Sequence, residues 1–366
     1  MRRAPSIVFV FNLLQDVNVL RGLVHLAARE TSASLVLLET TGFIKRDGRE
    51  VWRAELAKLA REAGAERFVY GQPAQALAAL WGRRGLIIAG SESDLSNHRQ
   101  VHELFRVAPP GWCRVTLQHG LECVGFLQNR EHVVAHGLDV RFGADVVVSW
   151  SGSPRMLTAM GPGEAAKLYV GGPSALLQRA VMGEAHPPID GGMVCENMHS
   201  VRLRATGDHV ASFMDVFEAF CAEEERAGNR VTLRPHPGGQ YVLRNDVPLP
   251  DNVTLNNLPI YEVALERYAY GISAPSTVVL DMVLAGIPTA VWRDPGGVMD
   301  ARNYDGLTPI DRLETWTAFA AEARERPHAI LERQRRYLDR LGILTDTGDI
   351  YARYARLLVN GLERAA

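Results

Sequence analysis

Two short polar turns in the second half of the chain have the composition of a phosphate-binding site. Residues 273–277 place the hydroxyls of Ser273, Ser276 and Thr277 at the start of an amphipathic helix. The first N–H groups of a helix are unpaired and lie at the positive end of its dipole, so this start favours an anion. Upstream, Arg234-Pro235-His236-Pro237-Gly238 directly follows an apolar strand. We expect both turns to lie on neighbouring strand ends and to bind a nucleotide sugar.

The prolines on both sides of His236 restrict the backbone and hold its imidazole in one direction. His236 can then donate to a phosphate oxygen, and Arg234 adds positive charge. Two structural alternatives stay open. The Arg-Pro-His-Pro segment can be a rigid surface turn, and the hydroxyls near residue 276 can be plain helix caps.

Two further strand ends carry carboxylates. Gln118-His119-Gly120-Leu121-Glu122 follows the apolar run 114–117, and Glu196-Asn197 follows the run 193–195, with Arg202 close behind. Each segment can instead be an ordinary turn or helix cap whose polar groups bond the nearby backbone. A metal site at His119, His132 and His136 is a further alternative, but the flanking pattern does not indicate the helix that His-x3-His needs.

Apolar runs alternate with helical periodicity throughout the chain, which predicts parallel βα units. Expected strands are Ile7–Phe11, Ser34–Leu38, Arg67–Tyr70, Leu86–Ala89, Arg114–Gln118, Val146–Trp150, Leu168–Val170, Met193–Cys195, Val231–Leu233, Val253–Leu255, Ala269–Ile272 and Thr289–Trp292. Expected helices are Val17–Arg29, Arg49–Ala63, Ala74–Trp81, Asn97–Arg106, Asp208–Ala227, Pro259–Arg267 and Ser276–Ala285, followed by a helical stretch over 313–366.

The Pro- and Gly-rich segment 183–192 interrupts this alternation and is the expected domain boundary. The pattern predicts an α/β protein with two Rossmann-like, doubly wound domains facing a central crevice. The expected parts are an acceptor-side domain over 1–185, a nucleotide-sugar domain over 192–330 and C-terminal helices over 331–366. Ligands of such sheets bind beyond the carboxyl ends of the strands, where the motifs above lie.

Composition narrows the function classes. The 366 residues are 47% hydrophobic and 22% charged with a net charge of −2, which argues against generic nucleic-acid binding. No apolar run approaches the roughly 20 residues that span a bilayer. The four cysteines form no Cys-x-x-Cys pair, which fits a reducing cytoplasm. Arginines 333, 335, 336 and 340 suggest either a solvated helix face or peripheral contact with the inner membrane.

Several nucleotide and hydrolase motifs are absent from the sequence. There is no Gly-x-x-x-x-Gly-Lys-Ser/Thr, no Gly-x-Ser-x-Gly, and no dinucleotide fingerprint in the first βα turn, 11–15. No Asp-x-Asp occurs, so a metal-chelated sugar diphosphate is not suggested. We therefore expect no cofactor and no metal.

Taken together, Arg234-Pro235-His236-Pro237, the 273–277 turn with Asp281, and Ala285-Gly286-Ile287-Pro288 resemble the C-terminal domain of GT-B glycosyltransferases that use cytidine nucleotides. The Gln118-His119-Gly120 turn and the Glu196-Asn197 strand end look most like the retaining β-Kdo transferases of lipopolysaccharide O-antigen synthesis. The resemblance implies transfer of Kdo from CMP-Kdo to a glycan acceptor, which can be lipid-linked.

The resemblance also implies residue roles. His236, Ser276 and Thr277 would hold the CMP phosphate without a metal, with Arg234, Ser273, Gln118, Gly120, Asn197 and Arg202 completing the donor site. Glu196 would be the nucleophile, where the family favours aspartate, and Glu122 would be the acid/base, with His119 also catalytic.

Three other functions stay open. An inverting CMP-sugar transferase of the sialyl type would need one base, either Glu122 or His119. A CDP-glycerol-type glycerophosphotransferase would keep both histidines and attack phosphorus. A non-catalytic nucleotide- or glycan-binding module would need no base.

Overall fold

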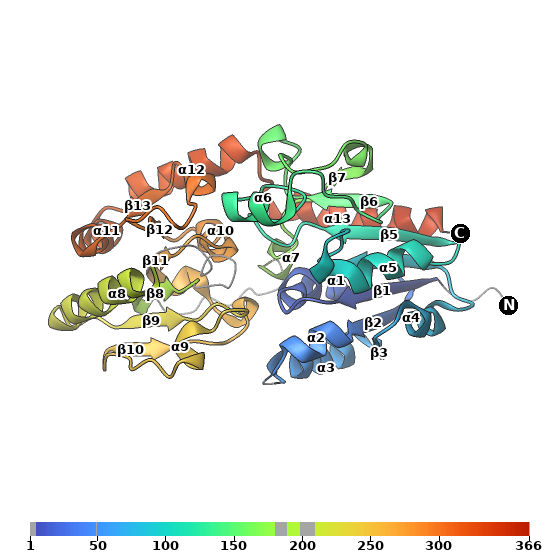
Figure 1. The fold of residues 1–366 in the computed structure, drawn as a ribbon, viewed down its shortest axis with the longest axis horizontal. Helices are drawn as coiled ribbons and strands as arrows, with labels where there is room; N and C mark the ends of the chain where they lie inside the picture. The colour runs from blue at the N-terminus through green and yellow to red at the C-terminus, as the bar shows by residue number, and fades with distance from the viewer. Residues whose placement is uncertain (1–4, 49, 180–188, 198–208, 366) are drawn as a thin grey trace. The chain divides into compact units, whose positions relative to one another are not determined.

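The computed structural model describes residues 5–48, 50–179, 189–197 and 209–365. The chain forms two compact units, each built on one parallel sheet (Figure 1). The first unit comprises residues 1–127, 136–183 and 342–366, and the second comprises 128–135 and 184–341. The predicted division placed residues 331–366 in a separate helical part, whereas 342–366 belong here to the first unit.

The first unit contains a sheet whose described strands run in the order β3-β2-β1-β4-β5-β6-β7. Its strands are β1 (Ser6–Phe11), β2 (Ser34–Thr40), β3 (Glu66–Tyr70), β4 (Gly85–Ala89), β5 (Trp112–Leu117), β6 (Val146–Ser149) and β7 (Leu168–Val170). Its helices are α1 (Asp16–Glu30), α2 (Thr41–Arg46), α3 (Val51–Ala63), α4 (Pro73–Leu80), α5 (Arg99–Val107), α7 (Leu176–Arg179) and α13 (Thr347–Arg364).

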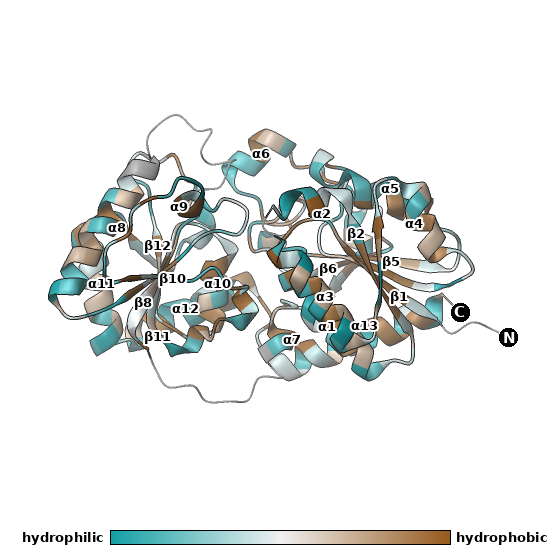
Figure 2. Cartoon of the chain, turned by 90° about the horizontal axis from the view of Figure 1, so that it is seen from below, coloured by the Kyte–Doolittle hydropathy of each residue, from teal (hydrophilic) through white to brown (hydrophobic). Residues whose placement is uncertain are grey.

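Helices cover both faces of this sheet, as its continuous apolar strands require. Helix α1 packs against α3, α7 and α13, while α4 and α5 pack together on the other face (Figure 2). All six side chains of β1 are buried. The switch point of the strand order, where ligands of such sheets bind, lies between β1 and β4.

The second unit contains a sheet whose described strands run in the order β10-β9-β8-β11-β12-β13. Its strands are β8 (Ile189–Cys195), β9 (Val231–Arg234), β10 (Val253–Leu255), β11 (Tyr268–Ser273), β12 (Thr289–Trp292) and β13 (Thr308–Ile310). Its helices are α8 (His209–Arg226), α9 (Tyr241–Arg244), α10 (Thr277–Leu284), α11 (Leu313–Glu325) and α12 (His328–Leu341), and α6 (Arg130–His136) joins it through residues 130–135.

An aromatic cluster forms the main core of the second unit. Phe213 of α8 lies 5.6 Å from Trp292 of β12 and 5.5 Å from Trp316 of α11, measured between ring centroids. Each ring meets its neighbour edge to face, the arrangement that aromatic quadrupoles favour. The same cluster includes side chains of β8, β9 and β11, and the predicted phosphate-binding turns follow the carboxyl ends of β9 and β11.

Several elements differ from the sequence-based prediction, among them strand β13 and helix α6, which were not predicted. Residues 259–267 form two short 3-10 turns, Ile260–Glu262 and Leu265–Arg267, instead of the predicted helix. Strand β8 starts at Ile189, so Gly191 and Gly192 lie inside a strand that was predicted to start at Met193. The other predicted strands are all present, with ends that differ by a few residues.

Three arginines of α12 contact neighbouring side chains. Arg336 pairs with Glu332 at 3.2 Å, Arg333 approaches Glu322 at 3.8 Å, and the Arg340 guanidinium carbon lies 5.5 Å from the Tyr337 ring centroid. None of the helices in the described parts of the chain combines the length and apolar composition needed to cross a membrane.

Candidate functional site

The predicted phosphate-binding turns converge at the carboxyl edge of the second sheet. Cys195 of β8 pairs in register with Arg234 of β9 on one side and with Ser273 of β11 on the other. The two turns therefore follow strands that flank β8, instead of the directly adjacent strands that we predicted. The switch point of this strand order lies between β8 and β11, where α/β sheets bind ligands.

Glu196 is buried immediately beyond β8, with 1% of its surface exposed. Its Oε1 accepts hydrogen bonds from the backbone N–H of Tyr241 at 2.9 Å and of His236 at 3.3 Å. Its own N–H donates to the Arg234 carbonyl. The carboxylate thus ties the end of β8 to the turn after β9 and to the start of α9.

The hydrogen bonds of His236 assign its tautomer. The Nδ1 atom accepts from the N–H groups of Gly238 at 3.1 Å and Gly239 at 3.3 Å. A ring nitrogen that accepts two N–H bonds carries no proton, so Nε2 of the neutral ring carries the hydrogen. The turn therefore presents a fixed imidazole N–H donor, which is what binding of a phosphate oxygen needs.

Arg234 and Asn197 serve the framework of this edge. Arg234 is 5% exposed and donates from its guanidinium to the Leu258 carbonyl at 2.6 Å. Burial lowers the pKa of Arg234, and the negative charge of Asp281 opposes that shift. The Asn197 side-chain amide donates to the Pro275 carbonyl, which joins the end of β8 to the turn before α10.

The start of α10 offers hydroxyls at a helix N-terminus. Ser276 is the N-cap residue, but its side chain makes no capping hydrogen bond, so the plain-cap alternative does not describe it. Thr277 is the first helical residue, and both side chains are partly exposed. Ser273 differs, because it is fully buried and donates to the Ala274 carbonyl within the same turn. Arg202 lies outside the described residues.

In the first unit, Gln118 has a structural role at the end of β5. Its side chain is 1% exposed, donates to the Gly120 carbonyl at 2.9 Å and accepts from the Trp150 N–H at 3.0 Å. These bonds fix the turn that carries His119 and Glu122. Glu122 is partly buried and forms an isolated bridge with Leu127.

The imidazole of His119 is held against the turn after β4. Its Nδ1 lies 3.0 Å from the Gly90 carbonyl oxygen, which can only accept, so Nδ1 carries the hydrogen and Nε2 the lone pair. Burial lowers the pKa of His119 to about 4, so the ring is neutral at pH 7. The Cys123 sulfur lies 3.4 Å from Nδ1 and 3.7 Å from Nε2 of the ring, and burial raises the pKa of this thiol to about 12.

A polar cluster that the sequence analysis missed surrounds the switch point of the first sheet. The fully buried Asp16 accepts from the N–H groups of Asn12 and Leu13, each at 2.8 Å, and from the Ser91 hydroxyl at 2.9 Å. Burial raises the pKa of Asp16 to about 6. The spacing Asn12-x-x-x-Asp16 directly after β1 was the signal available in the sequence.

The alternative metal site gains no support from the described residues. His132 and His136 lie on helix α6, which corrects our expectation that this segment is not helical. Within 5–48, 50–179, 189–197 and 209–365, no group of three or more His, Cys, Asp or Glu side chains is placed to hold a metal ion.

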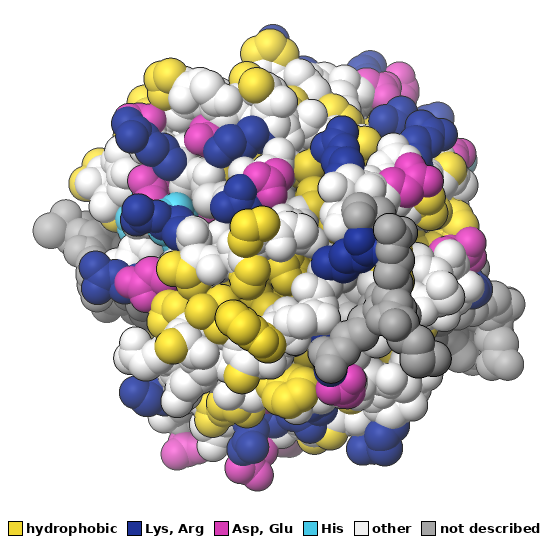
Figure 3. Space-filling view, turned by 90° about the vertical axis from the view of Figure 1, so that its right-hand side faces the viewer, with side chains coloured by type: hydrophobic (Ala, Val, Ile, Leu, Met, Phe, Trp, Pro, Cys, Tyr) yellow, Lys and Arg dark blue, Asp and Glu magenta, His cyan; other side chains and the backbone are white. Residues whose placement is uncertain are grey.

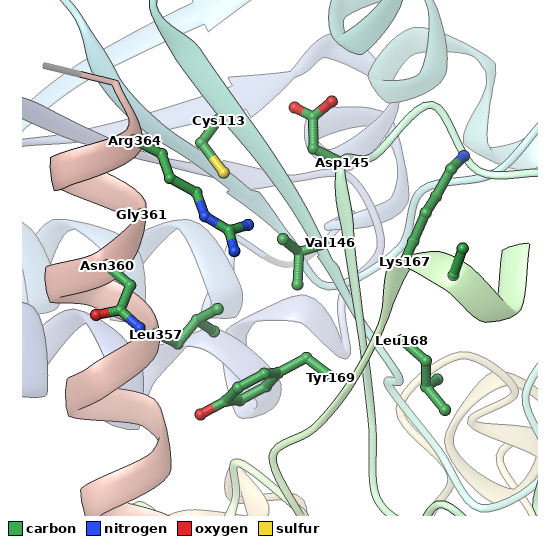
Figure 4. A pocket seen from close by; sticks show the side chains of 11 residues that line it. Cys113, Asp145, Val146, Lys167, Leu168, Tyr169, Leu357, Asn360, Gly361 and Arg364 are labelled. Atoms are coloured by element: carbon green, nitrogen blue, oxygen red, sulfur yellow. The ribbon is translucent and has the colours of Figure 1, made fainter.

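The amino edge of the first sheet, opposite the edge that carries the candidate residues, has exposed apolar side chains and a cavity. Apolar side chains gather there among Lys and Arg (Figure 3), and Trp81 and Val107, which end α4 and α5, are 77% and 47% exposed. A cavity of about 170 Å³ lies at this edge between the strand starts and α13 (Figure 4). It is lined by Asp145, Lys167, Tyr169 and Arg364, among others, and contains none of the predicted site residues.

No family model matches the sequence, and no curated protein does. Solved structures match nearly the whole chain. The UDP-GlcNAc 2-epimerase from Neisseria meningitidis bound to UDP-GlcNAc is 9% identical, with a TM-score of 0.57 and coverage of 98% of this chain and 99% of that chain. The wall teichoic acid polymerase TagF is 10% identical, with a TM-score of 0.62 and coverage of 98% and 89%.

The calicheamicin glycosyltransferase CalG4 is 14% identical to this chain, with a TM-score of 0.55 and coverage of 98% of this chain and 97% of that chain. At such low identities, the likeness concerns the fold. It confirms the predicted GT-B class, in which two parallel-sheet α/β domains are joined in one chain.

Proposed function

We propose that the protein is a glycosyltransferase that uses a nucleotide-sugar donor, and that the second unit binds the donor phosphate. The convergence of the β8, β9 and β11 ends at the switch point carries this proposal. It brings the Nε2–H of His236 and the hydroxyl-bearing start of α10 to one edge of one sheet.

The chemistry of this edge suits a departing phosphate. Breaking the bond between sugar and phosphate leaves negative charge on the phosphate oxygens. Donors that are already oriented stabilise such charge without reorganising. His236 is oriented by two backbone N–H bonds to its Nδ1, and the turn that carries it is held by Glu196. The dipole of α10 acts in the same direction.

We propose a CMP-sugar as the donor, with Kdo from CMP-Kdo as the specific candidate and a glycan as the acceptor. The Arg-Pro-His-Pro and Ser/Thr motifs support this donor by their resemblance to cytidylate-using enzymes. The neighbour from Neisseria meningitidis binds UDP-GlcNAc and CalG4 is a glycosyltransferase, which supports the broader class of nucleotide-sugar chemistry.

Two mechanisms are available to such a transferase. In the retaining route, Glu196 attacks the sugar and Glu122 assists the acceptor hydroxyl. The burial of Glu196 and its two backbone N–H partners suit a positioning role better than a nucleophile. We therefore favour the one-step route, in which the neutral His119 takes the proton of the acceptor hydroxyl.

Mass spectrometry of donor incubations tests the function and separates the mechanisms. The protein is incubated with CMP-Kdo, CMP-sialic acid, CDP-glycerol or UDP-GlcNAc, and released nucleotide and intact protein mass are measured. We expect CMP release from CMP-Kdo that a glycan acceptor accelerates, with no sugar adduct on the protein. An adduct that E196Q abolishes would establish the retaining route, and no nucleotide release from any donor would contradict the transferase proposal.

A further inference from the structure

The buried carboxylate of Asp16 joins two turns at the switch point of the first sheet. Its Oδ2 accepts from the Asn12 and Leu13 N–H groups of the turn after β1 and from the Ser91 hydroxyl of the turn after β4. The second oxygen, Oδ1, has no hydrogen-bond partner among the described residues. Asp16 is fully buried, and one of its carboxylate oxygens accepts three hydrogen bonds. These hydrogen bonds fix the two turns relative to each other.

The Gly90–Ser91 turn connects Asp16 to His119. A Cβ at Gly90 would lie 2.8 Å from Oδ1 of Asp16, so only glycine lets the carboxylate approach this closely. The carbonyl of the same glycine accepts the Nδ1–H of His119 at 3.0 Å. Ser91, which donates a hydrogen bond to Asp16, is therefore the residue that directly follows Gly90, whose carbonyl holds the His119 imidazole.

We propose that Asp16 is a positioning residue for His119, acting through the Gly90–Ser91 turn. It holds the Gly90 carbonyl where that oxygen selects the Nδ1–H tautomer, which leaves the Nε2 lone pair as the proton acceptor. At metal sites, removal of the partner that orients a ligating histidine costs about 10- to 100-fold in activity, and we expect an effect of that order here.

This inference rests on the proposed function, because it assumes that His119 acts on the acceptor hydroxyl. The balanced step is a single displacement. The acceptor oxygen forms a bond to the anomeric carbon and its proton moves to Nε2 of His119. The bond from the anomeric carbon to the phosphate oxygen breaks, and the nucleotide leaves with that electron pair.

Nitrogen-15 NMR of the full-length protein with labelled histidine rings tests the inference independently of activity. The variant H119Q identifies the His119 signals. We expect the Nδ1–H tautomer in the wild type and in D16N, since the asparagine carbonyl can accept the same three bonds. D16A and S91A should shift His119 toward a mixture of tautomers. S96A alters an exposed serine of the same loop and should leave the spectrum unchanged.

Steady-state kinetics give the second measurement. In D16A and S91A we expect kcat to fall about 10- to 100-fold with little change in the KM of the donor, and D16N to recover most of the loss. S91A keeps the test decisive if D16A does not fold. An unchanged His119 tautomer in S91A would overturn the inference. Absence of transfer in the wild type would instead refute the proposed function and leave the NMR result to decide the positioning role.

Discussion

At the scale of single residues, backbone hydrogen bonds give the two candidate histidines opposite tautomers. Nδ1 of His236 accepts two N–H bonds, so its Nε2 donates. Nδ1 of His119 donates to a carbonyl, so its Nε2 accepts. A donor suits a phosphate and an acceptor suits a hydroxyl proton. The two rings are therefore fitted to different tasks within the same reaction class.

The buried Asp16 should make the stability of the protein pH-dependent. Its folded pKa of about 6 lies above the ordinary value of 3.8, so folding favours the protonated acid. The contribution of Asp16 to the free energy of unfolding should therefore fall as the pH rises from about 4 to about 6. His98 and His119, whose pKa values burial lowers, act in the opposite direction, so the comparison with D16N isolates the Asp16 contribution. The asparagine of D16N does not titrate. The free energy of unfolding of D16N minus that of the wild type should therefore increase across this window by up to about 3 kcal/mol.

Urea unfolding of both proteins between about pH 4 and pH 7.5 measures this difference. D94N, which alters an exposed aspartate of the same unit, provides the control and should track the wild type. A constant difference between D16N and the wild type across the range would show that Asp16 is not a perturbed acid.

Sequence patterns identified the histidines but not their hydrogen-bond partners. Motif spacing predicts His119 and His236 because prolines and strand ends constrain the local backbone. The partners of His119 come from the turn after β4, and Asp16 comes from the turn after β1. Contacts between turns distant in sequence depend on sheet order, which residue types alone do not encode.

At the scale of elements, the glycine pair in β8 shows how packing overrides local signals. Gly191 and Gly192 predict a break because glycine is depleted in strands. In the structure, a Cβ at Gly192 would lie 1.9 Å from the Tyr270 ring, so glycine is required for the close approach of β11. Tyr270 is fully buried, and its hydroxyl donates to Glu224 at 3.0 Å, so the ring cannot move away cheaply.

Replacement of Gly192 by alanine should therefore destabilise the second unit strongly. We expect a loss of at least about 2 kcal/mol in the free energy of unfolding, toward the upper range for overpacked cores. Thermal and urea unfolding measure the loss. G48A provides the matched control, because no heavy atom lies within 4 Å of a Cβ at Gly48. Equal stability of the two variants would contradict the packing account of β8.

Segments without strong periodicity were the least predictable elements. A helix was predicted at 259–267, where Pro259 would begin it. The segment instead forms two short 3-10 turns, and Leu265 and Ile260 pack against side chains of β8 and β11. Helix α6 has no buried side chains, so it lacks the apolar stripe that identifies a helix from sequence. Packing decides the conformation of 259–267, whereas α6 begins with a local cap, in which the His132 N–H donates to Asn129 Oδ1 at 2.8 Å.

At the scale of the whole molecule, both units repeat one topology. Each sheet has a switch point between its first and fourth strands in chain order. The candidate residues follow these strands or a strand paired with one of them, β5 in the first unit and β9 in the second. Alternating apolar runs and helical periodicity were sufficient to predict this class. They could not predict that residues 128–135 join the second unit and 342–366 the first, because such exchanges follow from packing partners.

The proposed donor site requires that a cytidylate binds at the His236 turn. Calorimetric titration of the full chain with CMP, and with UMP and UDP for comparison, measures this binding in the wild type, H236A and H328A. His328 is an exposed histidine of the same unit and serves as the control. We expect saturable CMP binding that H236A weakens at least about tenfold, the effect of about 1.4 kcal/mol, and that H328A leaves unchanged. Equal CMP affinity in all three proteins, or no CMP binding by the wild type, would contradict the account.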